Sequence, residues 1–143
     1  MLILLNSMKV GDLWSQLKPG IAAGFTDSTI VTEELMRRIL HGALSNIVRI
    51  WLLVSEEAGL HAIITTTMTQ DVCNGKKNLL LYSMYMHQKP SGALMTDAYK
   101  TLTNAARKWG CSAVVLCTQE PRLIEIAKRF PGSSVDTYLT VRL

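Results

Sequence analysis

The turn before one predicted helix holds the residues whose types and spacing could bind a ligand. The stretch reads MHQKPSGALMTDAYKTL from residue 86, and Gly92 lies between small residues where a strand-like run gives way to a helical pattern. A helix N-terminus presents unpaired N–H groups and about half a positive charge, so it attracts phosphate. The hydroxyl of Ser91 could instead cap those N–H groups, and Pro90 supplies no donor. A weakened phosphate site and an ordinary capped helix start both fit these residues.

Other reactive side chains are scattered along the chain. The cysteines are odd in number and lack the spacing of metal ligands, which predicts reduced, mostly buried thiols. Cys117 ends a predicted strand, but no histidine is near it in sequence, so we do not expect a nucleophile there. The three histidines are also far apart, and we therefore expect no metal site.

Length and composition restrict the class of protein. A chain of 143 residues is most simply one domain, residues 1–143, able to bury roughly two-thirds of its unfolded surface. Its 48% apolar and 18% charged residues exclude disorder and indicate that a protein partner or a second copy covers some apolar surface.

The net charge of +4 comes from dispersed basic pairs, so we expect no specific nucleic-acid partner. No apolar run approaches the ~20 residues of a membrane helix, and the opening MLILL lacks the features of a signal peptide. We therefore expect no membrane span and a cytoplasmic location.

The first part of the chain predicts a strand and two helices. A short strand over residues 1–5 precedes a helix that Asp12 caps. Pro19 should stop this helix, because proline disfavours helix at the residue before it. A second helix has Thr32 as its N-cap and should end at Gly42.

The rest of the chain predicts a mixed sheet. Three runs joined by hairpin-sized turns indicate an antiparallel meander, over residues 47–55, 60–69 and 78–87. Apolar residues then recur at spacings of three and four, which predicts a helix over residues 92–108. The residues expected on its one apolar face are Leu94, Ala98, Leu102, Ala105 and Trp109. This helix should be a right-handed crossover to a parallel strand, residues 113–117, covered on both faces. A helix over residues 121–130 and a last strand over residues 138–143 complete the order.

This order of elements resembles the GCN5-related N-acetyltransferase (GNAT) fold over essentially the whole chain. The stretch ALMTDAYKTLTNAARKWGCSAVVLCT is similar to the family's central helix, glycine turn and following strand, and RLIEIAKRFPG resembles its next helix. The resemblance implies an α/β domain with a mixed central sheet flanked by helices. In that sheet an antiparallel meander joins a parallel βαβ unit, whose two strands splay into a V-shaped cleft.

The resemblance also implies a cofactor site at the turn described above. The family signature is Gln/Arg-x-x-Gly-x-Gly/Ala, and the backbone N–H groups of that loop bind the pyrophosphate of acetyl-CoA. Here Gln88 and Ala93 match, Ser91 replaces the first glycine, and Gly92 comes one place late. Weak binding of acetyl-CoA or another acyl-CoA is therefore implied at Gln88, Ser91, Gly92, Ala93 and Leu94.

Acyl transfer from a thioester to an amine needs a base, in this family often a Glu, and an acid, often a Tyr on the next helix. The strand 78–87 contains no carboxylate and the helix 121–130 contains no Tyr. The weak candidates that remain are Tyr85, His87, Glu120 and Tyr138. Packing is the favoured explanation of the strand tyrosines and exposure that of His87, whereas an acidic helix start explains Glu120 equally well.

Alternation along the strand 78–87 divides its side chains between two faces. Ser83, Tyr85 and His87 are expected on one face. The other face is expected to carry Tyr82, Met84 and Met86.

Two classes of function follow from the resemblance. The altered loop, the missing strand carboxylate and the missing helix tyrosine favour a non-catalytic structural or interaction protein. The layout also resembles proteins encoded among bacteriophage morphogenesis genes, which would place the chain in a virion. The alternative is an acyl-CoA-dependent N-acyltransferase.

Overall fold

The computed structural model describes residues 1–25, 27–137, 139–141 and 143. Its centre is a five-stranded sheet in the order β1-β2-β3-β4-β5. The strands are β1 (Leu2–Leu4), β2 (Val48–Ser55), β3 (Gly59–Gln70), β4 (Lys77–Met86) and β5 (Cys111–Leu116). The first four pair antiparallel, and β4 and β5 pair parallel. The predicted meander and parallel unit are therefore confirmed.

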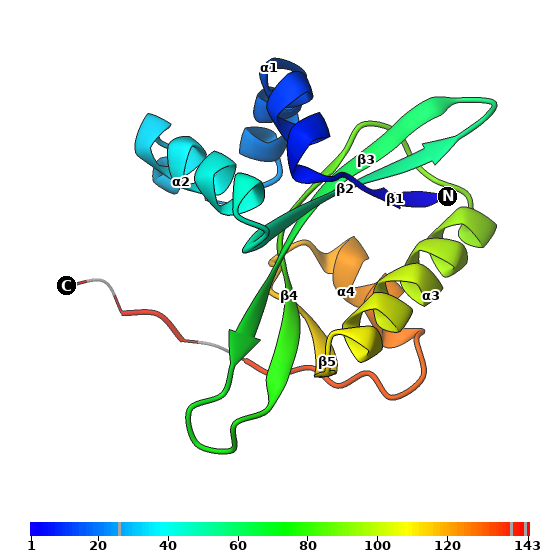
Figure 1. The fold of residues 1–143 in the computed structure, drawn as a ribbon. Helices are drawn as coiled ribbons and strands as arrows, with labels where there is room; N and C mark the ends of the chain where they lie inside the picture. The colour runs from blue at the N-terminus through cyan, green and yellow to red at the C-terminus, as the bar shows by residue number, and fades with distance from the viewer. Residues whose placement is uncertain (26, 138, 142) are drawn as a thin grey trace.

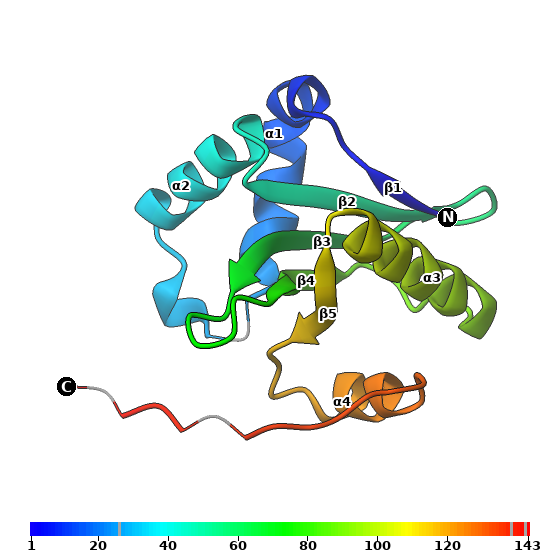
Figure 2. The ribbon, with the colours of Figure 1, turned by 60° about the horizontal axis from the view of Figure 1, so that its bottom comes forward.

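Helices cover both faces of the sheet (Figures 1 and 2). Helices α1 (Ser7–Ala23) and α2 (Glu33–Leu44), joined through a 3₁₀ turn η1 (Ser28–Ile30), pack on one face. Helix α3 (Gly92–Lys108) packs on the other face and connects the two parallel strands. Helix α4 (Pro121–Lys128) follows β5. None of the helices in the described part of the chain is long and apolar enough to cross a bilayer.

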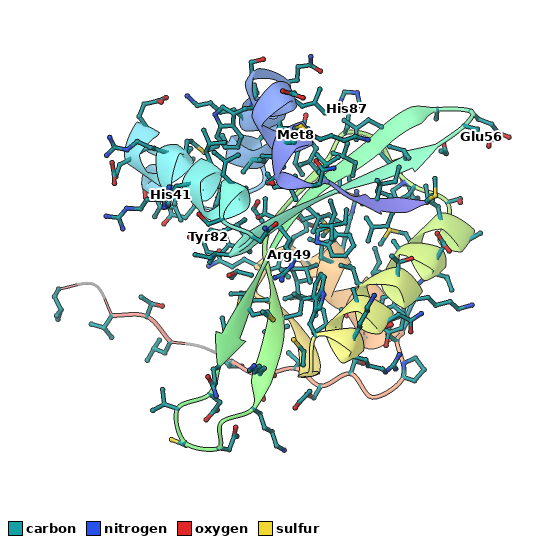
Figure 3. The ribbon with its side chains drawn as sticks, viewed as in Figure 1. Met8, His41, Arg49, Glu56, Tyr82 and His87 are labelled. Atoms are coloured by element: carbon teal, nitrogen blue, oxygen red, sulfur yellow. The ribbon has the colours of Figure 1, made fainter. Side chains whose placement is uncertain are left out.

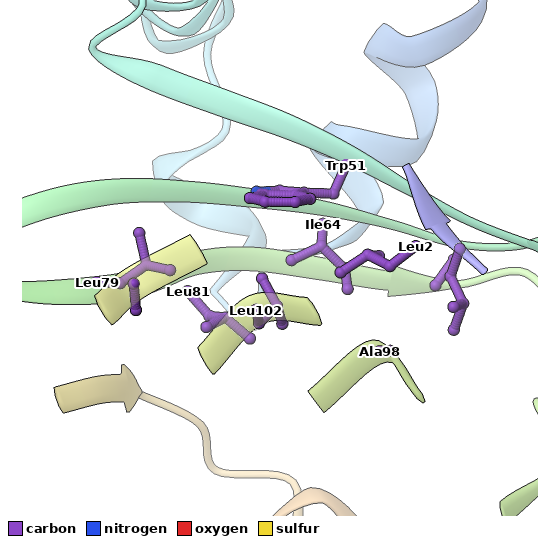
Figure 4. Close-up of a cluster of buried hydrophobic side chains, with 10 residues drawn as sticks. Leu2, Trp51, Ile64, Leu79, Leu81, Ala98 and Leu102 are labelled. Carbon is purple, nitrogen blue, oxygen red and sulfur yellow. The ribbon is translucent and has the colours of Figure 1, made fainter. Parts of the chain in front are cut away.

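The core between the sheet and α3 explains why this helix forms where the sequence predicts it. Ala98, Leu102 and Ala106 recur every fourth residue and are buried against sheet residues that include Trp51 and Leu79 (Figure 4). Leu94 and Trp109, predicted to share this face, lie at its two ends and are partly buried there. The helical periodicity of the sequence therefore identified the side that packs on the sheet.

Helix α1 begins earlier and ends later than predicted. Its N-cap is Asn6, whose side chain accepts a hydrogen bond from the Lys9 N–H at 2.8 Å, and not Asp12. The helix also continues through Pro19, so the predicted stop there is wrong. Proline removes one helical hydrogen bond, but Leu17 and Ile21 on either side are almost fully buried in the core. Tertiary packing outweighs the local preference.

Helix α2 starts as predicted but does not end at Gly42. The Thr32 hydroxyl caps it by accepting from the Leu35 N–H at 3.1 Å. Gly42 lies inside the helix and is buried, and a Cβ there would lie 2.8 Å from Val48 Cγ2. This glycine therefore allows the helix to approach β2 closely and is not a terminator.

Two predictions for the C-terminal third are wrong, and a third is confirmed except for its end. Strand β5 is not covered on both faces, because it lies at the sheet edge and Ser112 and Ala113 are exposed. The helix predicted over residues 121–130 is present as α4, which begins at Pro121 as predicted, ends already at Lys128, and has apolar residues that are half-buried rather than buried. The predicted last strand is absent from residues 139–141 and 143, while Tyr138 lies outside the described residues.

Candidate functional site

Strand β4 loses its parallel partner beside a β-bulge, because β5 ends at Leu116 opposite Leu81, and the open part of the β4 edge beyond Leu81 is called the splay below. Strand β4 pairs with β5 only from Lys77 to Leu81, and it continues to Met86 without a partner on that edge. On the β3 side, Leu81 pairs with Thr66 and Ser83 pairs with Thr65, so Tyr82 is an extra residue without a partner on β3. An extra residue of this kind bends a strand and increases its twist. The bulge therefore lies directly beyond Leu81, at the point where β5 ends and the edge of β4 becomes open.

The bulge also decides which face each side chain takes. Met84 and Met86 pack on the α3 side, as their alternation predicts. Tyr82 was expected beside them, but its ring meets Phe25 edge to face, with ring centroids 5.4 Å apart, on the side of α1. The prediction for Tyr82 is wrong because the bulge interrupts the two-residue alternation at this residue.

Helix α3 starts at the open end of the splay. The Ser91 hydroxyl caps it by accepting from the Leu94 N–H at 3.1 Å, and no acidic residue occupies the first turn. The N–H groups of Gly92 and Ala93 donate to no other described residue. A Cβ at Gly92 would have no atom within 4 Å, so space is open above this end of the helix. Two donors and the helix dipole are therefore available to an anion.

Gln88 holds the loop that precedes this helix. Its side-chain nitrogen donates to the carbonyl oxygens of Ala58 at 2.6 Å and Leu60 at 2.8 Å. Its backbone N–H donates to the His61 carbonyl oxygen at 3.2 Å. Gln88 is thus tied to the turn between β2 and β3, and its side-chain nitrogen and its backbone N–H are both already used within the protein.

The end of α1 occupies part of the splay. The His87 N–H donates to the His61 carbonyl oxygen, so by alternation the N–H groups of Met84 and Met86 point away from β3. The Met84 N–H donates to the carbonyl oxygen of Gly24 at 3.3 Å. A Cβ at Gly24 would lie 3.0 Å from the Met84 carbonyl carbon, so only glycine fits there without a shift.

The structure brings two of the four catalytic candidates together. Tyr85 is half-buried beside Gly20 of α1, and the centroid of its ring lies 6.4 Å from that of exposed His87. Figure 3 shows His87 well separated from Tyr82 along β4. Glu120 caps α4 by accepting from the Arg122 N–H at 3.3 Å, and Tyr138 lies outside the described residues. Within the described part of the chain, no group of three His, Cys, Asp or Glu residues could hold a metal ion.

A groove of about 490 Å³ lies between α3 and α4. Its lining residues are Met95, Thr96, Tyr99, Lys100, Ile126, Arg129, Phe130 and Pro131. Tyr99 and Phe130 stack in parallel with ring centroids 3.8 Å apart, which joins α4 to the rest of the fold. The sequence did not identify Lys100 and Arg129 as two cations of one groove, because no local pattern shows that α3 and α4 meet.

Comparison with known proteins identifies the fold. No protein-family model and no curated protein matches the sequence. A predicted acetyltransferase from Clostridium acetobutylicum, solved with acetyl-CoA, superposes with a TM-score of 0.69 at 15% identity, over 99% of this chain and 95% of that one. The chain has the GNAT fold.

Two further structures give the same result. A GNAT family acetyltransferase from Staphylococcus aureus matches with a TM-score of 0.66 at 13% identity, over 100% of this chain and 98% of that one. A ribosomal-protein-alanine N-acetyltransferase from Brucella melitensis matches with a TM-score of 0.65 at 12% identity, over 100% and 99%. At these identities the GNAT fold is established, and activity must be argued from the site.

Proposed function

We propose that this GNAT-fold chain does not catalyse acyl transfer and acts as a structural or interaction protein. The observation that carries the proposal is the contact between the Gly24 carbonyl oxygen and the Met84 N–H inside the splay. Attack on a thioester builds negative charge on its carbonyl oxygen, and donors already aimed at that oxygen lower the barrier most. A donor engaged by the protein's own backbone cannot do this without a rearrangement.

The side chains near the splay support the same proposal. Strand β4 contains no carboxylate that could take a proton from an ammonium group. β4 carries two tyrosines that could donate a proton, but Tyr85 packs beside Gly20 of α1 and Tyr82 packs against Phe25. Glu120 serves as the cap of α4, which is an ordinary structural role.

Weak binding of an acyl-CoA remains part of the proposal, because it needs only the helix terminus. The open N–H groups of Gly92 and Ala93 suit a pyrophosphate, and exposed Lys89 precedes them in the loop. The neighbouring groove adds the cations Lys100 and Arg129. This affinity would survive the loss of catalytic side chains.

The alternative function is an acyl-CoA-dependent N-acyltransferase. It is favoured by the splay at Leu81 and the open start of α3, and a structural neighbour was solved with acetyl-CoA. Under this alternative the end of α1 must move away and release the Met84 N–H. Tyr85 and His87 would then handle the two proton steps.

Calorimetric titration with acetyl-CoA, followed by a thioester-cleavage assay with added amines, separates these functions. We expect millimolar binding that Gly92→Glu abolishes, because a carboxylate would take the place of the phosphate and repel it. Asn104→Glu is the matched control, since it adds the same charge on an exposed site farther along α3. Steady, amine-dependent turnover of the thioester would reject the non-catalytic proposal.

The location of the chain belongs to the same proposal. The proposed location is the cytoplasm, or a virion if the chain is phage-encoded, as the layout that resembles bacteriophage morphogenesis proteins would imply. Mass spectrometry of purified particles separates the two, and a chain found only in the infected-cell lysate would contradict the virion.

A further inference from the structure

Two basic pairs that are far apart in sequence meet at one end of the sheet. Lys77, the first residue of β4, pairs with Cys111, the first residue of β5. Helix α3 ends at Lys108, shortly before Cys111 in the chain. The pair Lys76-Lys77 and the pair Arg107-Lys108 therefore lie near each other, and all four residues are exposed. The sequence indicated dispersed basic pairs, and the fold brings these two together.

Arg49 adds a further cation at this end of the molecule. Its guanidinium carbon lies 4.1 Å from the ring centroid of Trp109, which is the C-cap of α3. Its Nη1 atom is buried and has no hydrogen-bond partner among the described residues. The five cations are called the basic end below: Arg49, Lys76, Lys77, Arg107 and Lys108. None of them forms an ion pair with another described residue, so their charge is available to an anionic partner.

A two-stranded ribbon projects from the basic end. Strand β2 accompanies β3 only as far as Thr67, and β5 accompanies β4 only from Lys77, so the turn between β3 and β4 has no strand beside it. Every residue from 68 to 77 is exposed, and Figure 1 shows this turn extending past the ends of α3 and β5. The one acidic residue of the ribbon is Asp71, whose Oδ1 accepts from the N–H groups of Cys73 at 2.8 Å and Asn74 at 3.0 Å. Its carboxylate is thus held within the turn.

The shape and the side chains of the ribbon fit the major groove of duplex DNA. That groove is about 12 Å wide and admits a two-stranded β-ribbon, whereas the major groove of duplex RNA is too narrow. The ribbon carries Gln70, Asn74 and Lys76, which are residue types that contact phosphate groups. Val72 is the one large apolar side chain exposed at the tip, and insertion into a bilayer depends on a larger apolar area. These features favour DNA over a membrane surface.

We propose that the basic end binds the phosphate backbone of duplex DNA, with the ribbon in the major groove and Arg107 and Lys108 beside it. Phosphate contacts position a protein on the duplex but carry no sequence information. The binding is therefore independent of base sequence, which agrees with the expectation that the chain has no specific nucleic-acid partner.

This inference rests on the interaction role proposed above and deepens it by naming the class of partner. The basic end lies where β4 begins, and the splay lies beyond Leu81, toward the other end of the same strand. DNA binding is measured without acetyl-CoA, and thioester turnover is measured without DNA. Failure of one proposal is therefore distinguishable from failure of the other.

Fluorescence anisotropy of a labelled DNA duplex of arbitrary sequence, measured over a range of salt concentrations, is the first test. The four exposed cations predict a slope of about −4 in a plot of log K against log salt concentration, since each neutralised phosphate contributes about −0.9. Lys76→Gln combined with Lys77→Gln should make the slope shallower by about 2 and weaken binding at low salt by at least about ten-fold. Lys9→Gln combined with Arg122→Gln is the matched control, because it removes the same charge at exposed residues of α1 and α4, and it should keep the slope.

A second pair of substitutions tests the other side of the basic end. Arg107→Gln combined with Lys108→Gln should also make the slope shallower by about 2, and circular dichroism of each variant should match the wild type because all the changed residues are exposed. Duplex RNA of the same length should bind more weakly than DNA, because its major groove does not admit the ribbon.

Four results would overturn the proposal. They are a wild type that does not bind the DNA duplex, a slope that neither double variant changes, a control variant that changes the slope as much as they do, and equal affinity for duplex RNA. Equally tight binding to vesicles of phosphatidylserine and phosphatidylcholine would likewise reject it and assign the basic end to a membrane surface.

Discussion

The contact between the end of α1 and β4 depends on the absence of a side chain at residue 24, and Gly24→Ala tests it. The backbone of Gly24 is helical, with φ −78° and ψ −5°, so alanine meets no backbone penalty there. Its Cβ would lie 3.0 Å from the Met84 carbonyl carbon and 3.1 Å from the Tyr85 nitrogen. These are backbone atoms of β4, which are held by pairing with β3 and cannot move cheaply.

Three contributions set the expected change in the free energy of unfolding. Overpacking costs about 1–3 kcal/mol, and loss of the hydrogen bond between Gly24 and Met84 costs about 0.5–1.5 kcal/mol. Alanine also lowers the conformational entropy of the unfolded chain, which offsets about 0.4–1 kcal/mol of this loss of stability. The net result should be a loss of about 1–3 kcal/mol. Urea unfolding measures it as a lower midpoint with an unchanged slope.

Gly11→Ala, in the same helix, is the matched control. Its Cβ would lie 3.8 Å from Leu44 Cδ2, an ordinary contact, so the higher helix propensity of alanine should stabilise the protein by about 0.5–1 kcal/mol. If Gly24→Ala were as stable as Gly11→Ala, the contact in the splay would not exist as described.

The same variant tests the proposed function. If the Gly24 carbonyl oxygen takes the place of a ligand group at the Met84 N–H, folded Gly24→Ala should bind acetyl-CoA more tightly than the wild type. Calorimetry under conditions where both proteins are folded makes the comparison. An unchanged affinity would remove the observation on which the non-catalytic proposal depends.

Three further predictions concern stability. Leu102→Ala should cost about 2–5 kcal/mol in urea unfolding, since Leu102 is 7% exposed in the core beneath α3, and a near-neutral result would mean that this helix packs by another face. Ser83→Ala should cost about 1–3 kcal/mol, because it leaves the buried Thr65 hydroxyl without its partner at 2.7 Å, and adding Thr65→Val should recover part of the loss. Hydrogen bonds from Arg38, and to a smaller extent from Arg37, lower the pKa of Glu34. The stability that the ionised Glu34 side chain contributes is therefore fully present above the ordinary carboxyl pKa and is lost as the pH falls through the lowered pKa of Glu34. The difference in urea midpoint between wild type and Glu34→Gln should therefore be small at neutral pH, where Glu34 is solvent-exposed, and should shrink on acidification, whereas a difference that grows on acidification would contradict this origin.

Local signals in the sequence determined much of the fold. The Thr32 cap forms as expected, and the Ser91 cap forms as one of the two alternatives that the sequence left open, because a cap depends on residues within one turn of helix. The spacing of Ala98 and Leu102 identified the buried side of α3, and short turns specified the meander. The start of α3, the part of the candidate site that an anion would meet, was likewise readable from residues that are neighbours in the chain.

Only the tertiary structure decided the rest of the site. Helix α1 continues through Pro19 because Leu17 and Ile21, on the two sides of the proline, are both buried in the core. The bulge at Tyr82 depends on the register against β3, and the contact between Gly24 and Met84 joins residues far apart in sequence. Propensity and periodicity describe one segment at a time, whereas these features arise from the close packing of segments that meet only after folding.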